Sequence, residues 1–214
     1  MIEVVYFGSR EIYRDFETAV NSLRAYNPNV RVWGLIEDDA LDSPKDVNWI
    51  RWDWQKYFTE LPTRTKWKQF GPIRAAFTKI FPMLDKVISI DLDTIVRADI
   101  SPLWEIDLTD YHAAMCIEVT QNRPYHNNGV CVMNLAKIRA DGVDEQMIEE
   151  LNSNWHPYVG QDAMEMFCKT LDLDSEWNAC KFTAQCAEPK ILHFADRSDW
   201  RDLEVVKIYK GDRT

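Results

Sequence analysis

Residues 86–96 read Lys-Val-Ile-Ser-Ile-Asp-Leu-Asp-Thr-Ile-Val, so an apolar run leads directly into two carboxylates. Three of the four residues before Asp91 are apolar and β-branched, which is typical of a strand covered on both faces in a parallel sheet. In open α/β sheets the ligand crevice lies beyond the carboxyl ends of the strands. We therefore expect Asp91 and Asp93 to lie in a ligand-binding crevice.

Two carboxylates one residue apart repel each other and lose hydration on burial unless a positive group lies between them. A hard divalent cation with oxygen ligands, shared with a substrate phosphate, supplies that charge in many proteins. The alternative is a surface turn in which both aspartates face water, because a bare Asp-x-Asp pattern is common by chance. The rest of the sequence has to decide between these two interpretations.

Composition predicts one soluble globular domain over residues 1–214, long enough to bury a core without disulfides. Hydrophobic residues make up 46% of the chain and charged residues 28%, which is ordinary for this class. A net charge of −10 argues against a nucleic-acid partner, since phosphate backbones need clustered Lys and Arg. It leaves a nucleotide substrate open, because a bound metal neutralises phosphates locally.

The five cysteines form no Cys-x-x-Cys pair. Cys116 and Cys131 lie in apolar runs and are interpreted as small buried hydrophobic residues. Unpaired thiols fit a reducing compartment. We also expect no signal peptide and no membrane-spanning segment, so the predicted location is the cytoplasm.

Predicted strands and helices alternate along the chain, which indicates a mixed, mostly parallel central sheet flanked by helices in a single α/β domain. The segment 54–71 is the least regular and is predicted to be a mobile loop over the site. The predicted strands are 2–7, 30–36, 47–52, 87–91, 113–119, 129–135 and 191–194, and the predicted helices begin near 11 and span 73–81, 143–151 and 161–171.

Four motifs follow one another in a specific order. Together they resemble glycosyltransferase family eight, the glycogenin-like and lipopolysaccharide galactosyltransferase-like retaining enzymes with a Rossmann-like GT-A fold. The motifs are Arg74 with Pro82 to Lys86, Asp91-Leu92-Asp93 and Pro102-Leu103-Trp104; Asn127-Asn128-Gly129-Val130 with Met133-Asn134-Leu135; Gly160-Gln161-Asp162-Ala163; and Ile191-Leu192-His193-Phe194.

The resemblance implies a metal site and a nucleotide-sugar donor. Asp91, Asp93 and His193 would bind Mn²⁺, with Mg²⁺ as the alternative, and the ion would grip the diphosphate of a UDP-sugar. Carboxylate and imidazole ligands suit Mn²⁺, and such an ion assists the leaving diphosphate as a Lewis acid. Residues 1–100 would then form the nucleotide-binding half and residues 101–214 the acceptor and catalytic half.

The resemblance also implies a donor pocket. Beside Asp91 and Asp93, this pocket would contain Leu92 and Arg74. The alternative for Arg74 is a position on a solvated helix face. The uridine would lie against the residues of the first strand and the helix after it, with Tyr13 equally interpretable as a half-exposed helix aromatic. These residues are Tyr6, Phe7, Gly8 and Tyr13.

The reaction centre implied by the resemblance contains Asn127 and Gln161. Asn127 would line the donor sugar, or belong to an ordinary turn, and Gly129 would allow a close backbone approach. The Gln161 amide oxygen would stabilise the oxocarbenium-like centre in a front-face substitution. A double displacement would need a nearby carboxylate, and Gly160 replaces the aspartate common in the family. Asp162 would hold a sugar hydroxyl, or act as an acid at a helix N-terminus.

The last motif departs from the family pattern His-x-x-Gly-x-x-Lys-Pro-Trp. It runs from His193 to Trp200, is one residue shorter, and lacks both the glycine and the lysine that meets the diphosphate. We take Arg197 as the replacement, with Arg201 as the alternative. The predicted function is therefore retaining, Mn²⁺-dependent hexosyl transfer from a UDP-sugar to a glycan or other carbohydrate acceptor.

Two other functions stay open, a catalytically weak nucleotide-sugar-binding relative and a metal-dependent nucleotidyltransferase or phosphate-ester hydrolase. For the acceptor, Trp67 is a better candidate than Trp52, which we interpret as a core residue.

Overall fold

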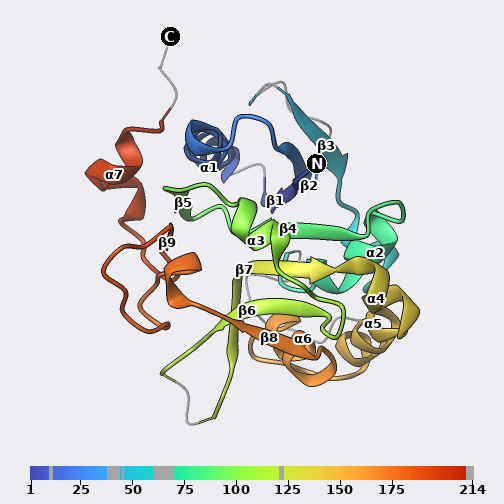
Figure 1. Cartoon of the computed structure of the whole chain (residues 1–214). Coiled ribbons are helices and arrows are strands. Elements are labelled where there is room, and N and C mark those ends of the chain that lie inside the picture. The colour runs from blue at the N-terminus through green and yellow to red at the C-terminus, as the bar shows by residue number, and fades with distance from the viewer. Residues whose placement is uncertain (10–11, 38–43, 45, 60–69, 121–122, 211–214) are drawn as a thin grey trace.

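The computed structural model describes residues 1–214 except 10–11, 38–43, 45, 60–69, 121–122 and 211–214, and the side chain of Tyr13 is also outside it. Helices and strands alternate through most of the described chain (Figure 1). The strands are β1 Glu3–Phe7, β2 Arg31–Ile36, β3 Val47–Arg51, β4 Lys86–Ile90, β5 Thr94–Val96, β6 Ala113–Ile117, β7 His126–Asn134, β8 Thr170–Leu173 and β9 Ile191–His193. The helices are α1 Tyr13–Tyr26, α2 Phe77–Ile80, α3 Ser101–Glu105, α4 Leu135–Ala140, α5 Val143–Ser153, α6 Gly160–Phe167 and α7 Glu204–Lys207, with 3₁₀ turns at Trp54–Lys56, Ile73–Ala76, Ser175–Trp177 and Trp200–Asp202.

The described strands form a seven-stranded sheet in the order β3-β2-β1-β4-β7-β6-β8 and a separate β5-β9 pair. Strands β3, β2, β1 and β4 pair in parallel, and so do β6 and β8, whereas β7 runs antiparallel to both of its neighbours. This confirms the predicted mixed, mostly parallel sheet. The parallel half aligns the carboxyl ends of β1, β2 and β4 at one edge, where a crevice is expected.

Alternation along the strands separates two cores on the two faces of the sheet. Val4 and Tyr6 of β1 pack with the apolar side of α1, including Phe16. Val5 faces the other way, into a cluster that contains Met147 of α5 and Met164 of α6. Both faces of the central strands are therefore buried, which explains why β4 has no polar alternation in its sequence.

Several elements differ from the sequence-based predictions. The helix predicted over 161–171 ends at Phe167, and Thr170–Leu173 continues as β8 beside β6. The elements β5, α3 and α4 have three to six residues each and were not predicted, because such short runs carry too little periodicity to register. The predicted helix over 73–81 divides into a 3₁₀ turn and α2.

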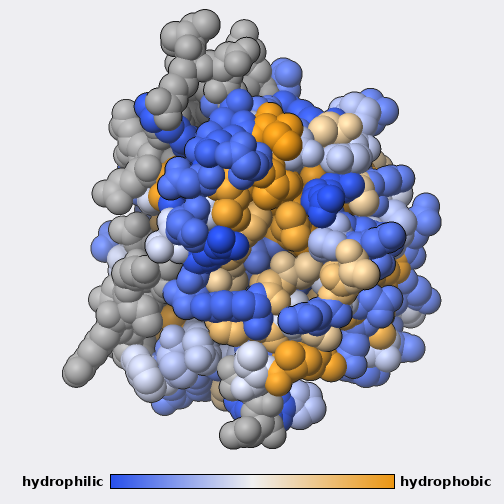
Figure 2. Space-filling view, turned by 90° about the vertical axis from the view of Figure 1, so that its left-hand side faces the viewer, coloured by the Kyte–Doolittle hydropathy of each residue, from blue (hydrophilic) through white to orange (hydrophobic). Residues whose placement is uncertain are grey.

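A third apolar cluster joins the β5-β9 pair to α7, with Ile95, Trp200 and Val206 at its centre. This pair and α7 lie on the face shown in Figure 2, where hydrophobic side chains are bordered by hydrophilic ones. None of the described helices has the length and apolar character that a membrane span requires.

Two side-chain interpretations can be compared with the structure. Trp52 is 2% exposed and stacks on Tyr57, which supports its interpretation as a core residue. Cys116 and Cys131 are buried and all five cysteines are free. Trp67, the acceptor candidate, and most of the predicted loop lie outside the described residues.

Candidate active site

Asp91 and Asp93 lie in the short connection between β4 and β5. The backbone of this connection is tied on both sides: Asp91 N–H donates to the Gly129 carbonyl at 2.8 Å, and Phe194 N–H donates to the Asp93 carbonyl at 2.9 Å. The Thr94 hydroxyl also donates to the Asp91 carbonyl at 2.7 Å. These bonds fix the two carboxylates against β7 and against the residue that follows β9.

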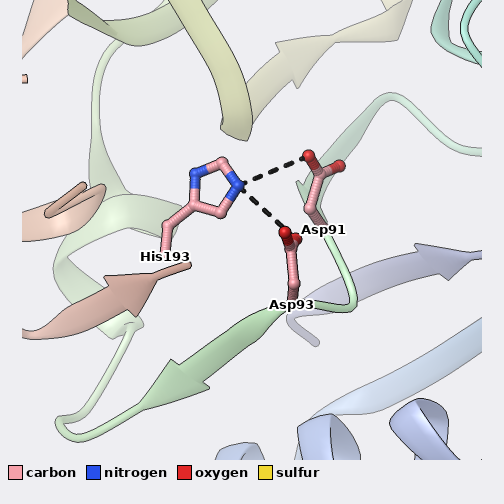
Figure 3. A group of neighbouring side chains, drawn as sticks. All are labelled: Asp91, Asp93 and His193. Atoms are coloured by element: carbon pink, nitrogen blue, oxygen red, sulfur yellow. Dashed lines mark ion pairs between the residues drawn. The ribbon is translucent and has the colours of Figure 1, made fainter. Parts of the chain in front are cut away.

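His193 reaches the same place through the β5-β9 pair. In that antiparallel pair Thr94 is opposite His193, so the imidazole emerges beside the residue that follows Asp93. Its Nε2 atom lies 3.5 Å from Asp93 Oδ1 and 3.8 Å from Asp91 Oδ2 (Figure 3). The structure thus brings together the three residues that the sequence pattern singled out.

Each carboxylate has its own cationic partner. The Arg74 guanidinium is 4% exposed, donates to Asp91 Oδ1 at 2.7 Å and to Ser89 Oγ at 3.1 Å, and stacks over the Phe7 ring. This burial excludes the alternative that Arg74 belongs to a solvated helix face. The buried guanidinium of Arg74 therefore fixes the orientation of the Asp91 carboxylate.

Asp93 and His193 shift each other's titration. Burial is the largest single influence on Asp93 and would raise its pKa, but the charge and hydrogen bond of His193, together with smaller contributions, hold that pKa below its ordinary value. Burial would lower the pKa of His193, but the charge and hydrogen bond of Asp93, with smaller contributions from Cys180 and Asp91, raise it to about 10. Without a metal, the imidazolium therefore supplies the positive charge that the paired carboxylates require.

The three side chains fit a divalent metal. One ligand atom from each of Asp91, Asp93 and His193 lies within 4.8 Å of the others, and the two carboxylates are partly exposed while His193 is buried. Two carboxylate oxygens and one imidazole nitrogen are a donor set suited to Mn²⁺ or Zn²⁺, and Mg²⁺ suits it less because of the imidazole. Asp91, Asp93 and His193 are thus the residues that would hold an ion here.

Strand β7 bulges where it passes His193. Met115 of β6 pairs with Cys131, but the next residue, Cys116, pairs with Asn127, so residues 128–130 have no partner on β6. A Cβ atom on Gly129 would lie 2.1 Å from His193 Cε1 and 2.4 Å from Nδ1. The bulge therefore packs the Gly129 backbone, which has no side chain, directly against the imidazole. This agrees with the expectation that Gly129 allows a close backbone approach.

Asn127 and Gln161 lie in one buried hydrogen-bond network with two residues that sequence reasoning missed. Asn127 Nδ2 and Gln161 Nε2 both donate to Glu118 Oε1, at 2.8 and 3.1 Å. Asn178 Nδ2 donates to Asn127 Oδ1 at 2.8 Å, and Asn178 Oδ1 lies 2.8 Å from His193 Nδ1. Glu118 and Asn178 carry no local motif, because only the tertiary fold brings them to the site.

The start of α6 explains the departure from the family pattern at Gly160. A Cβ atom there would lie 2.1 Å from the Gly71 carbonyl oxygen, so an aspartate does not fit without a backbone shift. Asp162 accepts hydrogen bonds from Tyr125 Oη at 2.7 Å and from Tyr158 N–H at 2.8 Å. The second bond is that of an acid at the third position of a helix, which supports the helix-terminal interpretation of Asp162. A sugar hydroxyl would have to share these oxygens.

The first strand approaches the carboxylates through Gly8. A Cβ atom on Gly8 would lie 2.4 Å from Leu92 Cδ1, so this glycine and Leu92 are in direct contact. Phe7 lies against Arg74, whereas the Tyr6 ring is fully buried beside α1, so the Tyr6 side chain is not available to a ligand. The side chain of Tyr13 is outside the described part of the chain.

The two basic residues of the last motif have different surroundings. Arg197 is on the surface, where its guanidinium binds Asp199 at 2.8 Å. Arg201 is held by both oxygens of the buried Asp15 in α1, and its charge contributes to the low pKa of Asp93. The geometry places Arg201 within electrostatic range of the candidate metal ligands.

Solved structures show the same architecture. The galactosyltransferase LgtC superimposes with a TM-score of 0.80 at 17% identity, over 98% of this chain and 95% of that one. The glycosyltransferase GlyE of Streptococcus pneumoniae gives a TM-score of 0.71 at 20% identity, over 97% of this chain and 59% of that one. The chain therefore has the α/β GT-A fold.

Sequence comparison gives the family. The family model described as "Glycosyl transferase family 8" matches residues 53–197, and the chain belongs to that family. A putative glycosyltransferase of Haemophilus influenzae is 26% identical over 181 residues, which cover 77% of this chain and 50% of that protein. The chain thus spans half the length of this curated relative.

Proposed function

We propose that the protein is a retaining, metal-dependent glycosyltransferase that moves a hexose from a UDP-sugar to a glycan or other carbohydrate acceptor. The observation that carries the proposal is the convergence of Asp91, Asp93 and His193 at the carboxyl end of β4 in a chain of this family. The galactosyltransferase with the same fold is described in complex with donor and acceptor sugar analogues, which supports two sugar partners.

In this proposal Asp91, Asp93 and His193 would hold Mn²⁺, or alternatively Mg²⁺, and Arg74 orients Asp91. The ion would supply Lewis-acid neutralisation of the charge on the departing diphosphate. Uridine lies against the carboxyl end of β1, at Phe7, Gly8 and the Tyr6 backbone, and Tyr13 is the further residue that the family resemblance implies for this pocket. A basic residue of the last motif, Arg197 or the better-placed Arg201, faces the diphosphate.

The reaction centre in this proposal lies at Asn127 and Gln161. The Gln161 amide oxygen faces the anomeric carbon as positive charge develops there. The bond between the anomeric carbon and the diphosphate oxygen breaks, and this leaving oxygen takes the proton of the acceptor hydroxyl. The acceptor oxygen then bonds to the same face of the anomeric carbon. Gly160 offers no carboxylate for a double displacement, and the Glu118 carboxylate is engaged by Asn127 and Gln161, so front-face substitution is the proposed course. The free cysteines fit a cytoplasmic location.

A panel of UDP-sugars, incubated with the protein in the presence and absence of Mn²⁺, tests this function. We expect Mn²⁺-dependent release of UDP from one UDP-hexose, because glycosyltransferases transfer some donor sugar to water. Binding without release would favour the weak nucleotide-sugar-binding relative. Formation of a sugar phosphate and UMP, instead of UDP, would identify phosphate-ester hydrolysis and contradict the proposal.

The high pKa of His193 makes metal binding depend on pH. The pKa of about 10 lies above the ordinary 6.5, so His193 is protonated near neutral pH and must release a proton to bind an ion. Mn²⁺ affinity is expected to rise about tenfold per pH unit between pH 7 and 8, as measured by calorimetry. The folding stability of the metal-free protein changes with pH in the opposite direction to Mn²⁺ affinity. The contribution of protonated His193 to the free energy of unfolding is complete below about pH 6.5 and is lost as the pH rises through about 10.

The control for this pH dependence is His193→Ala, which should bind Mn²⁺ weakly and with little change between the two pH values. A wild-type affinity that stays constant over the same range would show that no proton leaves His193 on binding. It would remove the imidazole from the proposed ligand set.

A further inference from the structure

The buried network between Glu118 and His193 has a single direction of donation. As a carboxylate, Glu118 only accepts hydrogen bonds, so Asn127 and Gln161 must both turn their amide nitrogens toward Oε1. Asn127 then presents its amide oxygen to Asn178, which must answer with Nδ2. The same Asn127 oxygen also accepts the Gly129 N–H at 3.0 Å, which holds it in this orientation.

The direction of donation continues to the candidate metal site. With its nitrogen committed to Asn127, Asn178 has only its oxygen left for His193, so the imidazole must donate from Nδ1. The other nitrogen, Nε2, then faces Asp91 and Asp93 and is the one available to an ion. A metal-binding histidine commonly has its tautomer fixed by such a bond to its second nitrogen.

The same carboxylate orients the other end of the network. Because Gln161 Nε2 donates to Glu118, its amide oxygen is directed away from that carboxylate, where it accepts the Asn128 N–H with an N···O distance of 3.5 Å. Asn178 is fully buried, and Asn127 and Glu118 are 6% and 7% exposed, so water has little access to these bonds. In such a place each bond constrains its neighbour strongly.

We propose that Glu118 is a positioning residue that sets the hydrogen-bond direction of this network. It thereby presents Nε2 of His193 to a metal at one end and the amide oxygen of Gln161 to the donor sugar at the other. The inference rests on the proposed function for what the two ends do. It adds a residue that couples the metal site to the reaction centre without touching either ligand.

The test compares Mn²⁺ affinity, followed by the electron paramagnetic resonance of free Mn²⁺, among variants of the full chain without nucleotide. Glu118→Ala should weaken Mn²⁺ binding about tenfold, in the range seen for groups that orient metal ligands. Glu118→Gln keeps an acceptor oxygen and should retain wild-type affinity. Gln161→Ala removes a network member but leaves the path to His193 intact, and should also retain it.

Two results would overturn the proposal: unchanged affinity in Glu118→Ala, or an equal loss in Glu118→Gln, which would make charge rather than bond direction responsible. If Glu118→Ala does not fold, Asn178→Asp decides. Its carboxylate still accepts from His193 but cannot donate to Asn127, so Mn²⁺ affinity should persist, and turnover should fall because Asn127 loses a bond that fixes its amide at the reaction centre. Loss of Mn²⁺ affinity in this variant, or full turnover, would contradict the proposal.

Proton NMR of the metal-free protein separates this inference from the proposed function. A slowly exchanging proton on His193 Nδ1 is expected in the wild type. It should exchange faster in Glu118→Ala, where the Asn178 oxygen that accepts it is no longer held in place, and if that variant does not fold it should stay protected in Asn178→Asp. Absence of Mn²⁺ binding to the wild type would undermine the proposed function alone. Absence of the protected Nδ1 proton would contradict the network direction whether or not the metal binds.

Discussion

Gly129→Ala is expected to abolish metal binding while the chain stays folded. The added Cβ atom would lie 2.1 Å from Cε1 and 2.4 Å from Nδ1 of His193, far inside van der Waals contact. The imidazole cannot keep its present buried position and its bond to Asn178 once that Cβ atom is added. It must therefore swing away from Asp91 and Asp93. Because a ligand is displaced, the loss should exceed the roughly 10–100-fold range seen when groups that only orient ligands are removed.

The measurement is a Mn²⁺ titration alongside thermal unfolding, with Gly142→Ala as the matched control. Gly142 precedes α5 with φ of 67°, and an added Cβ atom there would have no described atom within 4 Å beyond its chain neighbours, so its alanine variant suffers backbone strain but no clash. That strain costs about 1–2 kcal/mol of stability, comparable with the overpacking expected at Gly129. Gly142→Ala should lose stability and keep Mn²⁺ affinity. Wild-type affinity in Gly129→Ala would show that His193 is not a ligand.

The position of the paired carboxylates could be predicted because its cause is local. A buried parallel strand needs a continuous apolar run, and the two aspartates directly follow that run in the sequence. The need for a nearby positive charge was also predictable from their repulsion. Its identity was not, since Arg74 and His193 come from a 3₁₀ turn and from a three-residue strand.

His193 illustrates where local patterns stop. A strand as short as β9 has no periodicity of its own, so the residue was identified only through its resemblance to a family motif. The structure supplies the physical reason for its position, which is the register of β5 against β9. Glu118 and Asn178 lie further beyond sequence reasoning, because a buried glutamate at a strand end and an asparagine after a 3₁₀ turn look like ordinary polar residues.

Gly160 shows the converse, a departure from a family pattern that the structure explains. The carbonyl of Gly71 occupies the space that a side chain would need, and Val159 before it has φ of 47°, which is unusual for a β-branched residue. The start of α6 is thus held in a strained conformation close to the Gly71 backbone. Strain of this kind is common at functional sites, and Gln161, two residues after Val159, donates to Glu118.

Gln161→Ala is expected to lower turnover roughly 10–1000-fold, the range for loss of one preorganised polar group, with little change in UDP affinity. The reason is that the amide oxygen acts on charge that develops only in the transition state, whereas the donor nucleotide is held by other residues. Steady-state kinetics with the active UDP-sugar, together with calorimetric UDP binding in Mn²⁺, measure both quantities. Gln146→Ala, on the exposed face of α5, is the matched control and should leave both unchanged.

The outcome also distinguishes the proposed mechanism from its rivals. If turnover falls while UDP and Mn²⁺ still bind and the melting temperature is unchanged, Gln161 acts at the reacting centre, since a purely structural role would also lower stability or weaken binding. Unchanged turnover would remove Gln161 from the reaction and leave the metal residues unaffected. A product of inverted configuration would overturn front-face substitution, because the acceptor would then have attacked from the side opposite the diphosphate. We expect loss of turnover with retained configuration, because Gln161 is held by Glu118 through Nε2 and its amide oxygen is directed away from that carboxylate.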